Sequence, residues 1–376
     1  MMALKGALLL LFSFNCFSQA IKSPVARLVG NAYTSRALDN YSLFYNPAAI
    51  GPSKLVEVYP VNALGELSNV FENADKFKGF PSSPTGVAER IIDIPLSASA
   101  QGVPGIKFGP IAFNAFLGNE TNMILRNQVY PQLDISYRFD RGFIFGFASS
   151  WGSGGKYKKN SYTRTKKATA AGKNFSVGAA VKYVDRQSLD GNFSLFGTKL
   201  YSSIVDGSTD LDSLKETLGF NRGKGFGFNL GALYSWTTSL TEINIGAAVL
   251  DAFNTKFKKI DGDQAPNEIP MQIRTGFSFK QTLPALHYIL SVDAGPVLAD
   301  IDWKRKLHVG FELGIPLLDF FMGWSEGYMS YGVRTDLWFF NIIAGLYGQE
   351  LGVNYSEQKL SQFIFQIELF TFDFGL

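Results

Sequence analysis

His287 and His308 are the residues of this 376-residue chain best suited to acid–base chemistry. Ser291 and Glu312 each follow one of them by four positions. A hydrolase needs a nucleophile or a carboxylate held beside such a base. In a β-strand four positions span about 13 Å, at 3.3 Å per residue, so neither pair can form a direct hydrogen bond. We therefore predict no enzyme activity and no cofactor, and we place both histidines in structural hydrogen-bond networks.

The composition narrows the function classes further. The net charge of +3 is too small to indicate nucleic-acid binding. Two histidines and one cysteine provide few ligands for a metal cluster, so no metal site is expected. Phenylalanine is abundant, with 34 residues, and only 18% of residues are charged. This aromatic content is high for a soluble domain.

A strict two-residue alternation of apolar and polar side chains dominates the chain. It is clearest at 306–314, where Leu307, Val309 and Phe311 alternate with polar residues and glycine, and it recurs at 132–139, 175–183, 226–236, 271–280 and 286–294. Successive residues of a strand face opposite sides, so each segment has an apolar and a polar wall. Full charges and many glycines share the polar wall, and Tyr and Trp gather near strand ends. Both features favour an all-β, antiparallel transmembrane barrel with its apolar wall in lipid over a soluble barrel or a two-sheet sandwich.

The strand count depends on how the loops are divided. Fourteen strands result if 186–224 form one long excursion, and sixteen if 192–201 form a strand and 109–110 a turn; we predict fourteen, within a range of 12–16. In both countings 140–142 form a connection. Short turns are expected at 237–239, 283–285, 314–316 and 336–338, and longer loops at 253–267 and 348–359. The parity switch near Leu369 predicts a bulge or a strand end.

Two further segments have distinctive compositions. The loop at 153–173 contains seven basic and no acidic residues, which suits either binding to anionic lipopolysaccharide or a solvated loop. Residues 64–92 place Leu67, Val70, Phe71, Ala74 and Phe77 at helical spacing, which predicts a helical loop insertion.

Residues 1–20 have the pattern of a signal peptide. Lys5 precedes a short apolar core, and 18–20 end in the small residues that signal peptidase prefers, so cleavage is expected after Ala20. Beyond residue 20 no apolar run approaches the 18 residues of a membrane helix. These features predict export to the outer membrane of a Gram-negative bacterium.

The segment that follows resembles a known family. Residues 26–50 contain Phe44-Tyr45-Asn46-Pro47-Ala48, which resembles the opening of the long-chain fatty acid transporter (FadL-type) superfamily of outer-membrane barrels. Segments 303–312, 323–332 and 347–352 resemble its TraF-like branch. The resemblance implies a barrel of about fourteen strands at 54–376 with an N-terminal hatch, residues 21–53, inside it. The aromatic C-terminal strand is similar to the signal that barrel-assembly machinery reads, which makes that machinery an expected partner.

Together these features predict passage of small, fatty-acid-like hydrophobic molecules across the outer membrane, gated by the hatch. The expected gate is Phe44, Tyr45, Asn46 and Pro47. The expected lumen network that holds it by charge-assisted bonds is Arg274, Lys306, His308, Glu312, Arg334 and Asp336. The alternative is a non-transporting structural or assembly partner of an envelope complex. Expected partners are the lipid bilayer, lipopolysaccharide, a hydrophobic ligand and an envelope protein, but no nucleic acid.

Overall fold

The computed structural model describes residues 21–52, 55–68, 92–127, 132–153, 171–194, 219–337 and 340–375, together with 75, 78–79, 86, 89–90, 130, 157–159 and 166–168. The expected signal peptide lies outside these residues, as do most of 69–91 and most of the basic loop. Residues 64–68, expected in a helical insertion, instead complete a strand.

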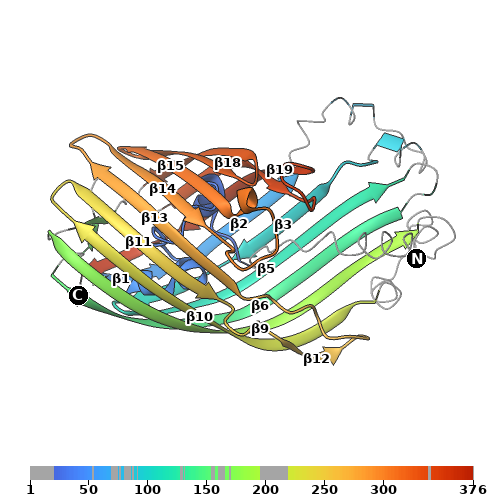
Figure 1. Ribbon diagram of the computed structural model, residues 1–376, viewed down its shortest axis with the longest axis horizontal. Helices are drawn as coiled ribbons and strands as arrows, with labels where there is room; N and C mark the ends of the chain where they lie inside the picture. Colours follow the sequence, from blue (N-terminus) through green and yellow to red (C-terminus); the bar gives the residue numbers. More distant parts are fainter. Residues whose placement is uncertain are drawn as a thin grey trace.

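Fourteen antiparallel strands form a closed ring (Figure 1). In ring order they are β2 (Val61–Ser68), β3 (Leu96–Gly102), β5 (Ile111–Arg126), β6 (Gln132–Gly152), β9 (Gly172–Ser194), β10 (Asn221–Thr237), β11 (Thr241–Leu250), β13 (Gln272–Thr282), β14 (His287–Ala294), β15 (Leu307–Ile315), β16 (Leu318–Ser325), β17 (Tyr328–Leu337), β18 (Phe340–Glu350) and β19 (Lys359–Leu369). Pairing of β19 with β2 closes the ring. The predicted all-β barrel of fourteen strands is confirmed.

Shorter elements extend or flank these strands. β1 (Leu55–Tyr59) precedes β2 across Pro60, β4 (Gly105–Phe108) follows β3, and β20 (Phe372–Gly375) follows β19. β12 (Phe257–Asp261) pairs with β10, and β7 (Tyr157–Lys159) pairs with β8 (Lys166–Ala168). The break between β19 and β20 lies at Phe370, whose positive φ of 54° ends the strand. The predicted parity switch is therefore a strand end.

The turn expected at 140–142 is wrong, because β6 runs through it without interruption. The Asp140 side chain points into the barrel, where both carboxylate oxygens accept hydrogen bonds of 2.8 Å from Arg186 on β9. The excursion expected at 186–224 is also shorter, since 186–194 belong to β9 and 221–224 to β10. Polar residues suggested loops here, whereas they line the interior of long strands.

The outer wall is apolar and the inner wall polar. On β14, Leu290 and Val292 are 46% and 42% exposed on the outside, while Ser291 and Asp293 on the inside are each 1% exposed. A protein that buries its polar side and exposes its apolar side has the pattern of a membrane barrel. The apolar wall therefore faces outward, as expected, and the closed ring excludes a sandwich. None of the helices in the described residues is long and apolar enough to span a membrane.

The two ends of the barrel differ. The short turns at 238–240, 283–286 and 316–317 lie at one end, which also receives the end of β19. β6 ends and β9 begins at this same end, so the connection that contains the basic loop joins them there. Longer connections, including 251–271, 295–306 and 351–358, lie at the opposite end.

Candidate functional site

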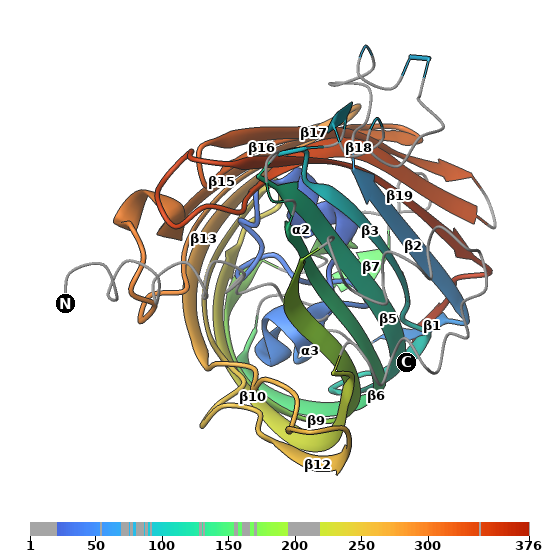
Figure 2. The ribbon, with the colours of Figure 1, turned by 90° about the vertical axis from the view of Figure 1, so that its right-hand side faces the viewer.

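The N-terminal segment, residues 21–52, lies inside the ring, where most of its residues are buried (Figure 2). It contains α2 (Pro24–Leu28), α3 (Ser42–Tyr45) and the 3₁₀ turn η2 (Pro47–Ile50). Ser23 caps α2 by accepting a hydrogen bond from the Ala26 amide, and Asn46 caps η2 by accepting one from Ala48. Proline at the first position of α2 and η2 suits these starts, because that position needs no amide donor.

Wall residues on many sides of the ring bind this segment. The Lys22 ammonium contacts Glu66 on β2 at 3.0 Å and Glu120 on β5 at 3.1 Å. The Asp293 carboxylate on β14 accepts hydrogen bonds from the backbone amides of Tyr33 and Thr34 at 2.9 and 2.7 Å. Further side-chain-to-backbone bonds come from Asn229 on β10 and Ser330 on β17 to carbonyls of the segment, each at 3.0 Å. The backbone of the segment, which cannot join the barrel ladder, is thus satisfied by inward polar side chains.

The four residues expected to form the gate lie in the middle of these contacts. The Asn46 amide group donates to the carbonyls of Thr34 at 3.0 Å and Ala232 on β10 at 3.1 Å, which joins the segment to the wall. The Tyr45 hydroxyl accepts from the Ser23 amide at 3.1 Å. Phe44 packs edge-on against Phe116 of β5, with 5.7 Å between ring centroids.

Glycines of the wall make room for this packing. A Cβ added at Gly178 would lie 2.5 Å from the carbonyl carbon of Pro47, and one added at Gly323 would overlap the backbone of Val29 and Gly30. The polar wall therefore contains glycine where the N-terminal backbone comes closest. The glycine-rich inner wall noted in the sequence has this steric reason.

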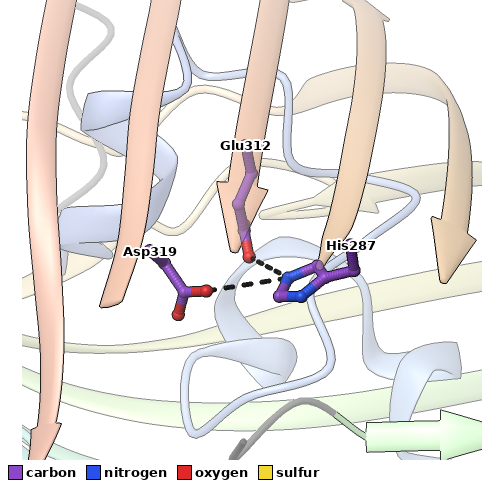
Figure 3. A group of neighbouring side chains, drawn as sticks. All are labelled: His287, Glu312 and Asp319. Atoms are coloured by element: carbon purple, nitrogen blue, oxygen red, sulfur yellow. Dashed lines mark hydrogen bonds and ion pairs between the residues drawn. The ribbon is translucent and has the colours of Figure 1, made fainter. Parts of the chain in front are cut away.

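A charged cluster forms around Glu312 on β15 (Figure 3). His287 Nε2 on β14 lies 3.3 Å from Glu312 Oε1 and 3.7 Å from Asp319 Oδ1 on β16. Gly314 separates His287 and Asp319 in the strand register, and a Cβ added there would overlap both side chains. The missing side chain lets residues of two non-adjacent strands meet across β15.

Two arginines complete this cluster. Arg36 of the N-terminal segment pairs with Glu312, and Arg334 on β17 donates to Asp319 at 2.8 Å and lies 3.7 Å from Glu312. One nitrogen and one oxygen from each carboxylate could together hold a metal ion, since these atoms lie within 4.8 Å of one another. A guanidinium already neutralises each carboxylate, so a cation would meet repulsion from both arginines. The arrangement is better suited to fixing Arg36, and with it the N-terminal segment, to the wall.

The structure brings together three of the six residues expected in the lumen network. Glu312 and Arg334 interact directly, and Asp336 lies 4.0 Å from Arg334. Arg274 is buried near Gly295 at the opposite end, and His308 Nε2 bonds to the Gly295 carbonyl at 2.8 Å. Lys306 is the last residue of η4 (Trp303–Lys306), directly before β15, and it donates to the Val297 carbonyl at 3.0 Å in the 295–306 connection. Its part in the network stays a prediction.

His308 has a partner that spacing along one strand could not reveal. Its Nδ1 lies 2.9 Å from Ser325 Oγ on β16, and Ser325 is the centre of Gly323-Trp324-Ser325-Glu326-Gly327, the spacing of a nucleophile elbow. The remaining ring nitrogen bonds to a carbonyl rather than to a carboxylate. Ser325 and His308 are 5% and 3% exposed. In the described residues, this buried pair joins β15 to β16 and to the Gly295 carbonyl.

Six charged residues of this interior were not expected from the sequence: Lys22 and Arg36 in the segment, and Glu66, Glu120, Asp293 and Asp319 on the wall. Lys22 and Arg36 lie in a segment without strand periodicity, so no pattern assigns them a partner. Asp319 follows a predicted turn, and its inward direction depends on the turn length. A one-residue shift of register would have placed it outside.

A cavity of about 180 Å³ remains between the N-terminal segment and the wall near the short-turn end. Arg36, Tyr33 and Tyr41 line it from the segment, and Glu312 and Arg334 connect it to the charged cluster. The N-terminal segment therefore does not fill the lumen completely.

No family model matches the sequence, and no curated protein does either. Among solved structures, the toluene transporter TbuX of Ralstonia pickettii shares 12% identity at a TM-score of 0.43, over 96% of this chain and 100% of that one. The toluene transporter TodX of Pseudomonas putida shares 10% at 0.44, over 93% and 99%. The monoaromatic hydrocarbon channel CymD shares 10% at 0.43, over 94% and 97%.

These neighbours are barrels of the FadL type, the superfamily that residues 26–50 resemble. The TraF-like branch stays a prediction. At such identities and TM-scores the likeness concerns the fold alone, so the function must be argued from the residues of this chain.

Proposed function

We propose that this chain is an outer-membrane barrel that passes small hydrophobic molecules, with the N-terminal segment as its gate. The observation that carries the proposal is the set of contacts that fixes residues 21–52 inside a closed ring. Opening the ring would break all backbone hydrogen bonds between two neighbouring strands, whereas moving the segment breaks only its individual contacts with the wall. The segment is therefore the element most able to change the lumen.

Three anchors hold the gate closed in this proposal. They are the Lys22 pairs with Glu66 and Glu120, the Asp293 bonds to the backbone, and the Arg36–Glu312 pair. Phe44, Tyr45, Asn46 and Pro47 shape the segment between the anchors. Loss of one anchor should raise the population of open segments without opening the ring.

Uptake of N-phenylnaphthylamine, a hydrophobic fluorophore that an intact lipopolysaccharide layer excludes, tests this function in whole cells. We expect expression of the chain to raise the initial uptake rate over cells with an empty vector. Arg36→Met should raise it several-fold further, and deletion of residues 21–52 should raise it most. Arg186→Met is the matched control, because Arg186 forms a buried ion pair within the wall, with Asp140 at 2.8 Å.

Uptake equal to that of empty-vector cells would contradict passage. Uptake that the chain raises but that Arg36→Met and the deletion leave unchanged would contradict gating. Surface amounts and heat-modifiable migration of each variant show whether the barrel has folded.

A further inference from the structure

Charged side chains form a row on the outside of the barrel, across the neighbouring strands β6, β9, β10 and β12 (Figure 1). Arg141 on β6 lies opposite Asp185 on β9 in the strand register. Lys224 on β10 lies between Asp185 on one side and Lys258 on β12 on the other. Residues that are opposite in the register point to the same face, and neighbouring strands are about 4.8 Å apart, so the row is about 14 Å long.

The row has an excess of positive charge. Asp185 accepts hydrogen bonds from Arg222 at 2.7 Å and from Arg141 at 3.1 Å, so two cations already neutralise it. Lys224 and Lys258 are exposed, and no ion pair or hydrogen bond joins either side chain to another described residue. Like charges directly opposite each other destabilise a sheet, so this lysine pair would be stabilised by an anion that both side chains contact. We call Arg141, Arg222, Lys224 and Lys258 the basic rim; together with the carboxylates of Asp185 and of Asp261, which lies opposite Arg222, its net charge is +2.

The basic rim directly borders the apolar outer surface. Two positions nearer the short-turn end, Phe143 on β6, Tyr183 on β9 and Phe226 on β10 form an outward row of rings, with centroids of neighbours 5.3 Å apart. The outward side chains of β10 stay apolar or aromatic from Phe226 to Trp236, ten positions that cover about 33 Å along the strand. At the tilt of about 40° that is usual in membrane barrels, this length spans about 25 Å of the bilayer, the height of their apolar band. Lys224, the next outward residue, therefore lies at the level of the lipid headgroups.

The end of the barrel at which the rim lies indicates the leaflet. Outer-membrane barrels direct their short turns to the periplasm. β10 enters the short turn 238–240 at one end, and Lys224 lies near its other end. The rim therefore faces the outer leaflet, which in a Gram-negative outer membrane contains lipopolysaccharide. The basic loop expected to bind this lipid leaves the barrel at the short-turn end, on the other side of the membrane.

We propose that the basic rim binds the lipid A phosphates of lipopolysaccharide, with the acyl chains along the aromatic row below it. Lipid A carries its phosphates at the two ends of a disaccharide, which a row of about 14 Å can contact together. Arginine donates paired hydrogen bonds to phosphate, and lysine adds a point charge. A soluble acidic protein would contact only the upper half of this surface, because the aromatic half belongs in the bilayer. Lipid binding to the outer wall needs no passage, so the inference goes beyond the proposed function and rests on its outer-membrane placement alone.

The test uses the full mature chain folded in detergent micelles, and native mass spectrometry counts the lipids that stay bound. The probes are lipid A with two phosphates, lipid A with one phosphate and phosphatidylglycerol. We expect saturable binding of bisphosphoryl lipid A, about tenfold weaker binding of the monophosphoryl form and still weaker binding of phosphatidylglycerol. Equal binding of the three lipids, or no binding of bisphosphoryl lipid A, would overturn the proposal.

Single variants locate the site. Lys224→Gln and Lys258→Gln each remove one charged contact, and each should weaken binding of bisphosphoryl lipid A about tenfold. Lys173→Gln is the matched control, because Lys173 is an exposed lysine of β9 at the short-turn end of the same wall, opposite Trp236. Unchanged affinity in both rim variants, or an equal loss in Lys173→Gln, would overturn the assignment.

Folding does not obscure this result. Each rim variant removes a repulsion between two lysines, so its thermal unfolding temperature should equal or exceed that of the unchanged chain. If one rim variant does not fold, the other variant and the lipid series still decide. Uptake of the hydrophobic fluorophore is measured separately in cells, so failure of passage and failure of lipid binding remain distinguishable.

Discussion

Replacing Arg36 by methionine should release the N-terminal segment locally while the ring stays intact. The Arg36 and Glu312 side chains are 7% and 3% exposed, so the variant leaves a buried carboxylate without its main partner. Removing one member of a buried ion pair costs about 3–5 kcal/mol. Arg334, at 3.7 Å, and His287, at 3.3 Å, still compensate Glu312 in part, so the lower end of that range applies.

Hydrogen exchange of the amides in residues 21–52, measured by mass spectrometry on the barrel in lipid vesicles, reports this release. A cost of about 3 kcal/mol corresponds to roughly 100-fold faster exchange if the segment exchanges by opening. The double variant Arg36→Met/Glu312→Gln removes both charges and should recover part of the protection. Arg222→Met is the control, because the Arg222 side chain in its pair with Asp185 is 30% exposed and should contribute less than about 1 kcal/mol. Equal exchange rates of residues 21–52 in Arg36→Met and Arg222→Met would show that the Arg36–Glu312 pair does not hold the segment.

Three further predictions concern the same interior. Gly323→Ala should destabilise the packed segment by about 1–3 kcal/mol in hydrogen exchange, whereas Gly65→Ala, whose added Cβ has its nearest contact at 3.9 Å, should not; equal effects would contradict the steric argument. Asp293→Asn should speed hydrogen exchange of the Tyr33 and Thr34 amides, which donate to Asp293, by roughly tenfold or more. Unchanged protection of these amides would show that this carboxylate does not anchor the segment. Ser325 should not react with a fluorophosphonate probe in the folded barrel; labelling that His308→Ala abolishes would reveal an enzyme.

The two-residue alternation of apolar and polar side chains made the outer wall predictable from the sequence. Leu290 and Val292 point outward and Ser291 and Asp293 inward, as a period of two requires. The end of β19 was predictable for the same reason, because the apolar parity switches at Leu369. Local patterns therefore define the wall.

The interior depends on contacts between distant positions. Arg36 and Glu312 are 276 residues apart, and their meeting requires the register of several strands and the path of a segment without periodicity. Asp140 looked like a turn residue because its partner, Arg186, is contributed by the next strand of the ring. Lys306 continues the alternation one position beyond the start of β15, so the pattern alone does not define its direction.

The wall of the barrel that faces lipid determines both the membrane fold and the proposed passage. Phe320 and Phe321 are neighbours on β16, 45% exposed on the outside and 3% exposed on the inside. In a background without the five native tryptophans, Phe320→Trp and Phe321→Trp place the same fluorophore at one depth on opposite walls. With vesicles of lipids brominated in the acyl chains, we expect strong quenching of the tryptophan at 320 and little at 321. Equal quenching at both positions, or stronger quenching at 321, would contradict the account.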